Sequence, residues 1–505
     1  MCGVIGVLGT PQASRRVQAG LTLLQHRGQD AAGILSYNEA SGFHFTKNLG
    51  LVDQAITQPA IESLIGNAAI GHTRYSTVGK SELSGVQPFL LNYPYGIGIV
   101  HNGNLVNFSK LSRELQVESR RHPLTQSDTE TILNLFGEAL ARASEGQKLN
   151  FHHICEAIKT VQTRAVGSYS CVALIAGYGL IGFRDPHGIR PLLFAKRTET
   201  DGNTSYLFAS ESGAAQFLDY NSIEEVGPGE VISVSLEGRV DRAQLNAKNH
   251  RPCMFEWIYF ASPQSEIAKS PVYRARIQLG KRLAHKVKKE IESGRIKPDI
   301  IVPVPETARI AAIALSEELG LPYRELLIKN RYISRTFILD SQDKREKAVQ
   351  LKIAPVESEI RGRNILLVDD SIVRGTTSKK LVALLKHCGA KEVTFVSTAP
   401  PIRYPCHYGI DFPNREELIA HDKDETEIEK TMGVDRVVYQ DIEDLRSALQ
   451  PNSDLSLYGK TDFTPCEACL TGDYPTSIKD YEPRQENQNI HAKTTKPLVA
   501  KSPDL

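Results

Sequence analysis

The chain has 505 residues, of which 41% are hydrophobic, which is enough for about two to four domains with buried cores. This composition excludes a disordered chain and a small disulfide-stapled scaffold. The 60 basic and 59 acidic side chains leave a net charge of +1, so the overall charge favours neither nucleic acid nor an anionic membrane as a partner.

The sequence contains no segment typical of a membrane span or a secretory leader. The longest mostly apolar run, residues 171–183, is interrupted by glycines and is shorter than the ~18–20 residues that cross a bilayer. Residues 1–6 lack the cationic and apolar parts of a secretory signal. We therefore expect a soluble cytoplasmic protein whose eight cysteines are thiols, metal ligands or nucleophiles.

Residues 2–235 are predicted to form antiparallel sheet, because short alternating strands are separated by glycine turns. Over residues 169–175, for example, successive side chains are expected to alternate between outward and inward. From about residue 255 onwards, helices alternate with continuously apolar strands, which indicates a parallel sheet covered on both faces. The two domains are expected to meet within residues 236–255.

The second predicted domain, residues 255–475, contains an amphipathic helix and two strand–loop–helix units. Apolar residues recur at spacings of three and four over 273–291, which favours a half-buried helix over an RNA-binding one. The two units are a strand at 300–304 before a helix at 307–320, and a strand at 365–368 before a helix at 376–388. Residues 476–505 are polar and poor in apolar side chains, and are predicted to be a disordered tail.

Cys2 is a candidate nucleophile, because removal of Met1 would leave its thiol and a free amino group on one residue. An α-amino group has an ordinary pKa of ~7.7–8.0, so near neutral pH it can accept the thiol proton. The position alone is equally compatible with a small apolar residue at the start of a buried strand.

Four polar clusters lie in or beside the apolar strands of the same domain, where polar groups need partners. They occupy residues 26–33, 71–75, 101–104 and 127–130. With the Met-Cys-Gly start, they resemble the class II glutamine amidotransferase domain, an N-terminal-nucleophile hydrolase. The resemblance covers residues 2–235 and implies an α+β fold of αββα type, in which two sheets lie between helix layers.

The resemblance implies three residues for the hydrolysis of glutamine. Cys2 corresponds to the nucleophile that attacks the side-chain amide and forms a thioester. Asn102 and the backbone N–H of Gly103 correspond to the oxyanion hole, and losing one such donor typically lowers the rate ~10²–10³-fold.

The resemblance also implies four residues that bind glutamine. Arg74 corresponds to the partner of the substrate α-carboxylate, since a guanidinium can bind a carboxylate through two parallel hydrogen bonds. Asp128 corresponds to the partner of the α-ammonium group. Arg27 and Thr77 are expected to line the same pocket.

A second candidate site follows the strand at 365–368, where Asp369 and Asp370 precede a loop and a helix. A loop at a helix N-terminus presents free N–H groups that suit a phosphate. Paired carboxylates at the carboxyl end of a parallel strand can hold ribose hydroxyls and Mg²⁺. The segment resembles the phosphoribosyl pyrophosphate signature of the type I phosphoribosyltransferases, whose α/β fold has a parallel sheet.

The signature and a second loop supply the candidate residues for this donor. Those in the signature are Asp369, Asp370, Ser371, Arg374, Gly375, Thr376 and Thr377, and those in a loop at 329–338 are Lys329, Arg331 and Arg335. The loop resembles one that closes over pyrophosphate. Mg²⁺ is expected at Thr307, Asp369 and Asp370.

Nearly the whole chain to about residue 475 resembles one family, the glutamine phosphoribosylpyrophosphate amidotransferases, which open de novo purine synthesis. The family implies glutamine and phosphoribosyl pyrophosphate as substrates, ammonia passing between the sites through a channel, purine nucleotides as inhibitors, and a homotetramer. Four positions depart from the family pattern. Ser262 and Gln264 replace Arg and Asp, Ser334 replaces Gly, and Gln350 replaces Arg, which puts loop closure and donor affinity in doubt.

Cys253, Cys406, Cys466 and Cys469 are a candidate metal site. Four thiolates can hold either structural zinc or an iron–sulfur cluster, and the spacing does not decide between them. The positions resemble the subgroup of the family that carries a 4Fe-4S cluster, which favours iron. The other reading is unrelated buried thiols.

The sequence therefore predicts an amidophosphoribosyltransferase, a glycosyltransferase that makes 5-phosphoribosylamine, glutamate and pyrophosphate. A regulatory protein that binds phosphoribosyl pyrophosphate but has lost transfer is the alternative. A glutaminase that feeds ammonia to a partner is a further one.

Overall fold

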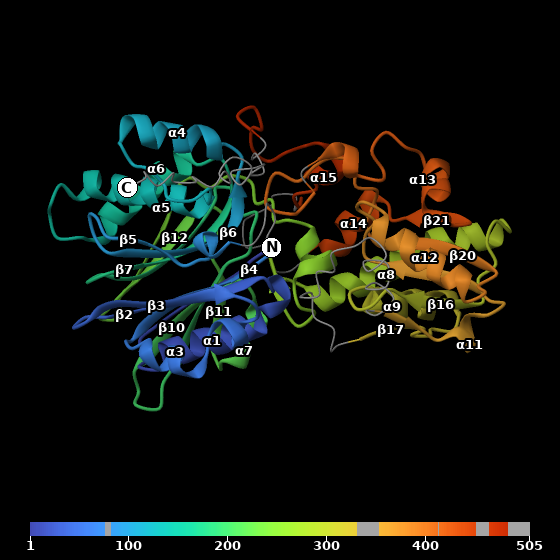
Figure 1. The fold of residues 1–505 in the computed structure, drawn as a ribbon, viewed down its shortest axis with the longest axis horizontal. Helices are drawn as coiled ribbons and strands as arrows, with labels where there is room; N and C mark the ends of the chain where they lie inside the picture. The colour runs from blue at the N-terminus through green and yellow to red at the C-terminus, as the bar shows by residue number, and fades with distance from the viewer. Residues whose placement is uncertain (76–81, 331–352, 413, 451–463, 483–505) are drawn as a thin grey trace, which may run out of the picture.

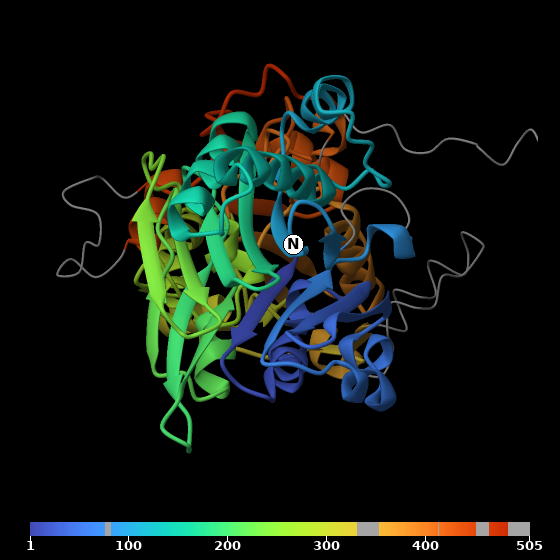
Figure 2. The ribbon, with the colours of Figure 1, turned by 90° about the vertical axis from the view of Figure 1, so that its left-hand side faces the viewer.

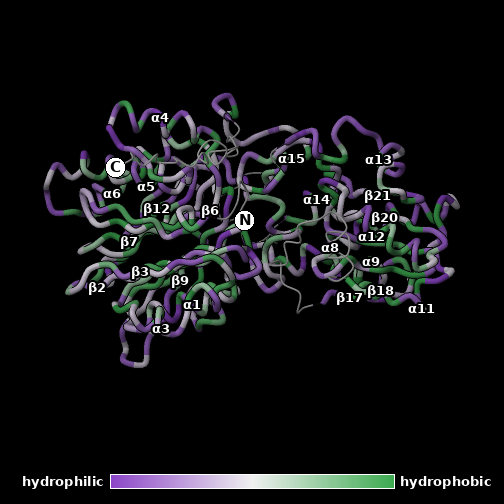
Figure 3. Tube along the Cα trace, viewed as in Figure 1, coloured by the Kyte–Doolittle hydropathy of each residue, from purple (hydrophilic) through white to green (hydrophobic). Residues whose placement is uncertain are grey.

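The computed structural model describes residues 1–75, 82–330, 353–412, 414–450 and 464–482, which form two lobes side by side (Figure 1). The first lobe holds two antiparallel sheets between helices, and the second holds a parallel sheet between helices. The N-terminus lies where the two lobes meet (Figure 1). Hydrophobic residues concentrate on the strands, and hydrophilic residues on the outer loops (Figure 3).

The first lobe has a seven-stranded and a six-stranded sheet, in the orders β11-β9-β10-β1-β4-β2-β3 and β13-β12-β8-β7-β6-β5. The first comprises β1 (Gly3–Leu8), β2 (Ala31–Asn38), β3 (Gly42–Leu49), β4 (Ala68–Arg74), β9 (Leu193–Thr198), β10 (Thr204–Ala209) and β11 (Ser222–Glu225). The second comprises β5 (Phe89–Leu91), β6 (Ile97–Leu105), β7 (Gly167–Ile175), β8 (Gly179–Arg184), β12 (Glu230–Ser235) and β13 (Val240–Gln244). Since β13 lies beyond residue 235, this lobe extends past the predicted boundary.

Helices cover the outer face of each sheet. The seven-stranded sheet packs against α1 (Ala13–Leu23), α2 (Val52–Ala55), α3 (Gln58–Ser63) and α7 (Ser212–Phe217). The six-stranded sheet packs against α4 (Phe108–Glu118), α5 (Asp128–Ser144) and α6 (Phe151–Arg164). Figure 2 shows the teal helices on one side of the sheets and the blue helices on the other. The predicted αββα architecture is therefore present.

The strand at β7 corrects one expectation from the sequence. Every residue of β7 is buried, so its side chains do not alternate between solvent and core. One face of its sheet packs against α5 and α6, and the other packs against the second sheet. Alternate side chains of β7 therefore point to two different buried faces, because the strand lies between a helix layer and the second sheet.

The second lobe has a parallel sheet in the order β16-β19-β20-β21. Its strands are β16 (Ile300–Pro303), β19 (Asn364–Asp369), β20 (Glu392–Ser397) and β21 (Arg436–Tyr439). The helices α8 (Val272–Glu292) and α9 (Arg309–Leu319) cover one face, and α12 (Thr376–His387) and α13 (Glu425–Met432) cover the other. A short antiparallel pair joins β17 (Leu327–Lys329) to β18 (Ile353–Pro355). The predicted parallel sheet with two covered faces is confirmed.

A separate apolar cluster fills the region between the lobes. It includes the π-helix Glu256–Phe260, the start of α8, and α14 (Ile442–Leu449) and α15 (Ala468–Thr471) near the end of the described chain. Beyond α15, Asp480 and Glu482 form ion pairs with Lys110 and Arg113 on α4. Part of the predicted tail therefore contacts the first lobe, and residues 483–505 lie outside the described residues. None of the described helices has the length and apolar character of a membrane span.

Candidate functional site

Cys2 lies at the start of β1, close to where the two lobes meet. Its backbone N–H donates to Asn102 Oδ1 at 3.2 Å, and its carbonyl accepts from Arg27 Nε at 3.0 Å. Met1 precedes it and is buried, and burial is the main reason why the pKa of the Met1 amino group falls to about 6. That amine belongs to Met1, whereas the amine expected to act as the base is that of Cys2, which becomes free when Met1 is removed.

Asn102 and Gly103 lie side by side on β6, beside Cys2. Asn102 is buried, and its Nδ2 has no hydrogen-bond partner among the described residues, while its Oδ1 is held by Cys2. Gly103 has a φ of 152°, and a Cβ there would lie 2.0 Å from the Ser168 carbonyl oxygen. Only glycine fits this close approach. The amide of Asn102 can therefore donate to an oxygen above Cys2.

Arg74 and Asp128 lie at the ends of the elements that surround Cys2. Arg74 ends β4, and the pairing of Gly3 with Thr73 places it beside Cys2 at the open end of β1. It is half-buried, and its Nη1 donates to the Glu82 carbonyl at 3.4 Å. Asp128 begins α5, is buried and accepts from the backbone N–H of Leu105 at 3.1 Å. The predicted pocket residue Thr77 lies outside the described residues.

Arg27 lies against the backbone of Cys2. Its side chain is fully buried, and all three guanidinium nitrogens are engaged. Besides Nε on the Cys2 carbonyl, Nη1 donates to Glu211 at 2.5 Å, and Nη2 donates to both oxygens of Glu256 at 2.9 Å. Arg27 holds the backbone of Cys2 in place, and Glu211 and Glu256 hold Arg27. That Arg27 also lines the glutamine pocket stays a prediction.

The second site begins where β19 ends. Asp369 is the last residue of β19, and the Asp370 carboxyl is hydrogen-bonded by the hydroxyls of Ser371, at 2.7 Å, and of Thr307. Burial raises the pKa of Asp370 to about 6, and burial together with the charge of Asp370 raises the pKa of Asp369. The structure thus brings together the three predicted Mg²⁺ ligands.

The loop after Asp370 leads into α12 as the sequence predicts. Gly375 has a φ of 70°, and a Cβ there would lie 2.3 Å from Ile419 Cδ1, so the position requires glycine. Thr376 and Thr377 begin α12, where backbone N–H groups have no partner within the helix. The Arg374 guanidinium pairs with Glu417 at 2.6 Å and lies 3.8 Å from Asp411, and its role in binding the donor stays a prediction.

The predicted closing loop is only partly described. Lys329 ends β17 and is exposed, which places it at the base of that loop. Arg331, Arg335, Ser334 and Gln350 lie outside the described residues. The other two departures from the family pattern are described, and Ser262 Oγ donates to Gln264 Oε1 at 2.6 Å. Two neutral side chains therefore occupy the positions at which the family pattern has Arg and Asp, so neither position carries a charge that needs a partner.

The four cysteines belong to the apolar cluster between the lobes, in which Cys253, Cys466 and Cys469 are buried and Cys406 packs against them. Cys253 forms a β-bridge with Cys466, and the backbone N–H of Tyr408 donates to Cys406 Sγ at 3.4 Å. Burial raises the pKa of Cys253 to about 11 and also raises that of Cys469. Among the described residues, no three His, Cys, Asp or Glu side chains are grouped closely enough to hold a metal ion as they stand.

Arg190 lies beside the cysteines with its charge buried. It is fully buried, its Nε donates to the Tyr408 carbonyl at 3.0 Å, and its Nη1 lies 3.6 Å from Glu256. Nη1 has no hydrogen-bond partner in the described part of the chain. The positive charge of Arg190 acts against the high thiol pKa values of Cys253 and Cys466.

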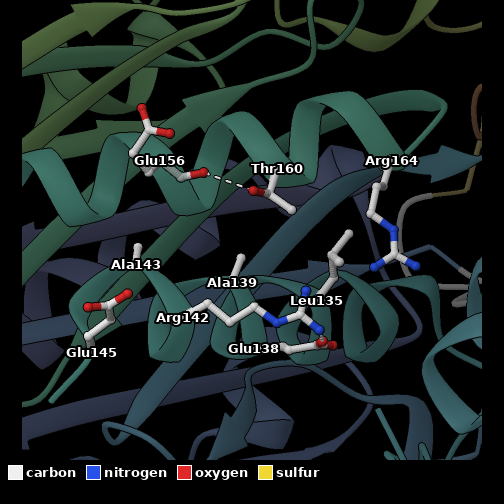
Figure 4. A pocket seen from close by; sticks show the side chains of 9 residues that line it. All are labelled: Leu135, Glu138, Ala139, Arg142, Ala143, Glu145, Glu156, Thr160 and Arg164. Atoms are coloured by element: carbon white, nitrogen blue, oxygen red, sulfur yellow. Dashed lines mark hydrogen bonds and ion pairs between the residues drawn. The ribbon is translucent and has the colours of Figure 1, made fainter. Parts of the chain in front are cut away.

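A shallow groove between α5 and α6 lies apart from these residues (Figure 4). Its charged lining includes Glu138, Arg142, Glu156 and Arg164, and Arg142 forms an ion pair with Glu138. The groove is on the outer face of the helix layer and contains none of the residues predicted for a site.

Comparison with known proteins identifies both lobes. Residues 72–216 match the glutamine amidotransferase domain, and residues 273–427 match the phosphoribosyl transferase domain. Over 450 residues the chain is 43% identical to an amidophosphoribosyltransferase of Pseudomonas aeruginosa, covering 89% of each. It is 39% identical to that of Saccharomyces cerevisiae, over 95% of this chain and 93% of the yeast protein.

The same relationship appears in solved structures. The chain is similar to the glutamine phosphoribosylpyrophosphate amidotransferase of Bacillus subtilis in complex with ADP and GMP. The TM-score is 0.81 and the identity 34%, over 94% of this chain and 98% of the other. An allosteric regulatory enzyme of purine biosynthesis matches with a TM-score of 0.83 and 34% identity, over 95% of this chain and 98% of that chain.

Proposed function

The chain belongs to the amidophosphoribosyltransferase family, and we propose that its two lobes carry the two halves of that reaction. Glutamine is hydrolysed at Cys2, and the ammonia is transferred to C1 of 5-phosphoribosyl 1-pyrophosphate beside Asp369 and Asp370. The products are glutamate, 5-phosphoribosylamine and pyrophosphate, as in the first step of de novo purine biosynthesis.

In the first half-reaction, Cys2 Sγ attacks the side-chain amide carbon of glutamine. Once Met1 is removed, the Cys2 amine takes the thiol proton and later returns it to the leaving ammonia. Asn102 Nδ2 and the Gly103 N–H stabilise the negative oxygen of the tetrahedral intermediate. Water then hydrolyses the thioester to glutamate. The unpartnered Nδ2 of Asn102, held beside Cys2 through Oδ1, supports this assignment most directly.

The amino-acid end of glutamine binds at Arg74 and Asp128. Arg74 offers two parallel hydrogen bonds to the α-carboxylate, and the Asp128 carboxylate pairs with the α-ammonium group. Together they select an amino acid, because a substrate lacking either charge would leave a charged group of the protein without its partner.

In the second half-reaction, the lone pair of ammonia forms the bond to C1 while the bond from C1 to the pyrophosphate oxygen breaks. Positive charge develops on the ribose, so Asp369 and Asp370 stabilise the transition state more than the ground state. The N–H groups at the start of α12, with Thr376 and Thr377, suit the 5′-phosphate. Lys329 and the predicted loop cations Arg331 and Arg335 would bind the pyrophosphate.

The residues fit a bound Mg²⁺. Asp369, Asp370 and Thr307 offer only oxygen ligands, as Mg²⁺ prefers, and neither carboxylate has an ion-pair partner among the described residues. Burial is the main cause of the raised pKa values of both carboxyl groups. When bound, the ion would neutralise charge on the pyrophosphate.

The four cysteines fit a 4Fe-4S cluster. Three buried thiols, the half-buried Cys406 with an N–H donor to its Sγ, and the buried Arg190, whose Nη1 makes no hydrogen bond among the described residues, form an environment for a cluster that carries negative charge. When bound, the cluster would clamp the end of the chain onto both lobes. Iron and acid-labile sulfide in anaerobically purified protein, without zinc, would agree with this proposal. Stoichiometric zinc would contradict it.

The assembly and regulation follow the family. We propose a homotetramer inhibited by purine nucleotides, supported by the similarity to the B. subtilis protein in complex with ADP and GMP. The cytoplasmic location expected from the sequence stays a prediction.

The overall proposal is tested by measuring glutamate and pyrophosphate in parallel. Purified chain is mixed with glutamine, Mg²⁺ and phosphoribosyl pyrophosphate, and equal yields of the two products are expected. Glutamate without pyrophosphate would favour a glutaminase that supplies another protein. Donor binding without either product would favour the regulatory protein.

A further inference from the structure

The π-helix Glu256–Phe260 lies between the two sites and is held by a buried arginine from each lobe. Arg27 comes from the first lobe and binds the side chain at the start of this helix. Arg276 comes from α8 and binds backbone carbonyls along this helix. Both arginines are at least nine-tenths buried, so their hydrogen bonds do not compete with water.

On the first side, the contact runs directly to the nucleophile. Glu256 is completely buried, and both of its carboxylate oxygens accept from Arg27 Nη2 at 2.9 Å. The same guanidinium donates through Nε to the Cys2 carbonyl. Because the guanidinium is planar and rigid, a displacement of Glu256 changes the direction in which Nε holds Cys2. Glu256 thus acts on Cys2 through Arg27 and does not touch the substrate.

On the second side, Arg276 fastens the backbone of the same helix along its length. Its Nε donates to the Trp257 carbonyl at 2.8 Å, and its Nη2 donates to the Ala261 carbonyl at 2.8 Å. The helix that carries Glu256 is thus anchored to α8 of the second lobe, which fixes where its carboxylate meets Arg27.

We propose that Glu256 is a positioning residue for glutamine hydrolysis, which acts on Cys2 through Arg27. The proposal rests on the proposed hydrolysis of glutamine at Cys2 and adds a residue that holds the nucleophile in place.

The first test is Glu256→Gln, with Glu266→Gln as the matched control on an exposed side chain. Glutamine should bind with a KM within about twofold of the parent, while kcat for its hydrolysis falls about 10- to 100-fold, since Cys2 is misaligned. Alkylation of Cys2 by iodoacetamide should slow in parallel, whereas synthesis from ammonium and the donor stays at the parental rate. An unchanged kcat, or an equal loss of the ammonium-dependent rate, would overturn the proposal.

Failure of the proposed glutamine hydrolysis itself is distinguishable from failure of this inference. In the first case the parent enzyme would release no glutamate, whereas in the second the parent would release glutamate and Glu256→Gln would release it at the parental rate.

Discussion

Around Cys2 the buried charges are paired within the protein, whereas around Asp369 and Asp370 they are not. Arg27 is bound by Glu211 and Glu256, whereas neither aspartate forms an ion pair among the described residues. The glutaminase site is therefore held in its working geometry by the fold. The phosphoribosyl site is completed by what binds to it. Substitutions near Cys2 should therefore lower kcat by moving the catalytic groups, whereas substitutions near Asp369 and Asp370 should weaken the binding of the donor and Mg²⁺.

The largest expected effect is at the nucleophile. Cys2→Ala removes the group that forms the thioester, so release of glutamate should fall at least ~10⁴-fold. Synthesis from ammonium and the donor should continue, since it uses only the second lobe. Both rates are measured on the same preparation. A variant that still releases glutamate at an appreciable rate would show that another group attacks glutamine.

A smaller effect is expected at the oxyanion hole. Asn102→Ala removes one donor to the developing negative charge, which should lower kcat for glutamine hydrolysis ~10²–10³-fold with little change in KM. Steady-state kinetics of glutamate release check it. A rise in KM at constant kcat would instead place Asn102 in ground-state binding.

A third prediction concerns Asp370 and pH. The pKa of Asp370 in the folded protein is about 6, above its ordinary value, so the folded state binds the proton more tightly than the unfolded state. This stabilises the protein at low pH, and the stabilisation is lost as pH rises through about 6. Asp370→Asn removes the buried charge, so without Mg²⁺ the Tm of the variant at pH 8 should be about 2–4 °C above that of the parent. At pH 4, where Asp370 is protonated in the folded parent, the two Tm values should be nearly equal.

Thermal melts of both proteins in chelator at the two pH values check this. Transfer activity should be lost in the same variant, because the donor and Mg²⁺ lose a ligand. A variant that melts lower than the parent at pH 8 would show that Asp370 is already paired in the folded protein.

The smallest effect is expected at the departure from the family pattern in the closing loop. Gln350→Arg restores a cation, which should lower the apparent KM for the donor a few-fold by attracting pyrophosphate. The KM is measured with saturating glutamine. An unchanged KM would mean that other residues already replace that cation.

The sequence predicts the parts of each site that are local in the chain. Asp369 and Asp370 end one strand, Gly375 is followed at once by a helix, and Asn102 precedes Gly103, so short motifs define their neighbours. The alternating elements of the second lobe likewise predict its sheet. Local patterns suffice wherever neighbours in the chain are also neighbours in space.

Long-range partners could not be predicted in this way. Arg27 meets residues 184 and 229 positions away, and no local pattern announces that its charge is buried between them. Arg276 occurs in an amphipathic pattern in which an arginine is ordinarily solvent-exposed, yet it folds back onto the preceding turn. The burial of both faces of β7 has the same cause, because it depends on a second sheet whose strands are distant from β7 in the chain.

The central claim, that nitrogen released at Cys2 is the nitrogen that reaches the donor, is tested by one labelling measurement. The parent enzyme is given amide-¹⁵N glutamine, phosphoribosyl pyrophosphate and Mg²⁺ with a modest excess of unlabelled ammonium, and 5-phosphoribosylamine is analysed by mass spectrometry. The account predicts a product that carries predominantly ¹⁵N, with one glutamate formed per pyrophosphate. A product that carries the isotope ratio of the free ammonium would contradict it.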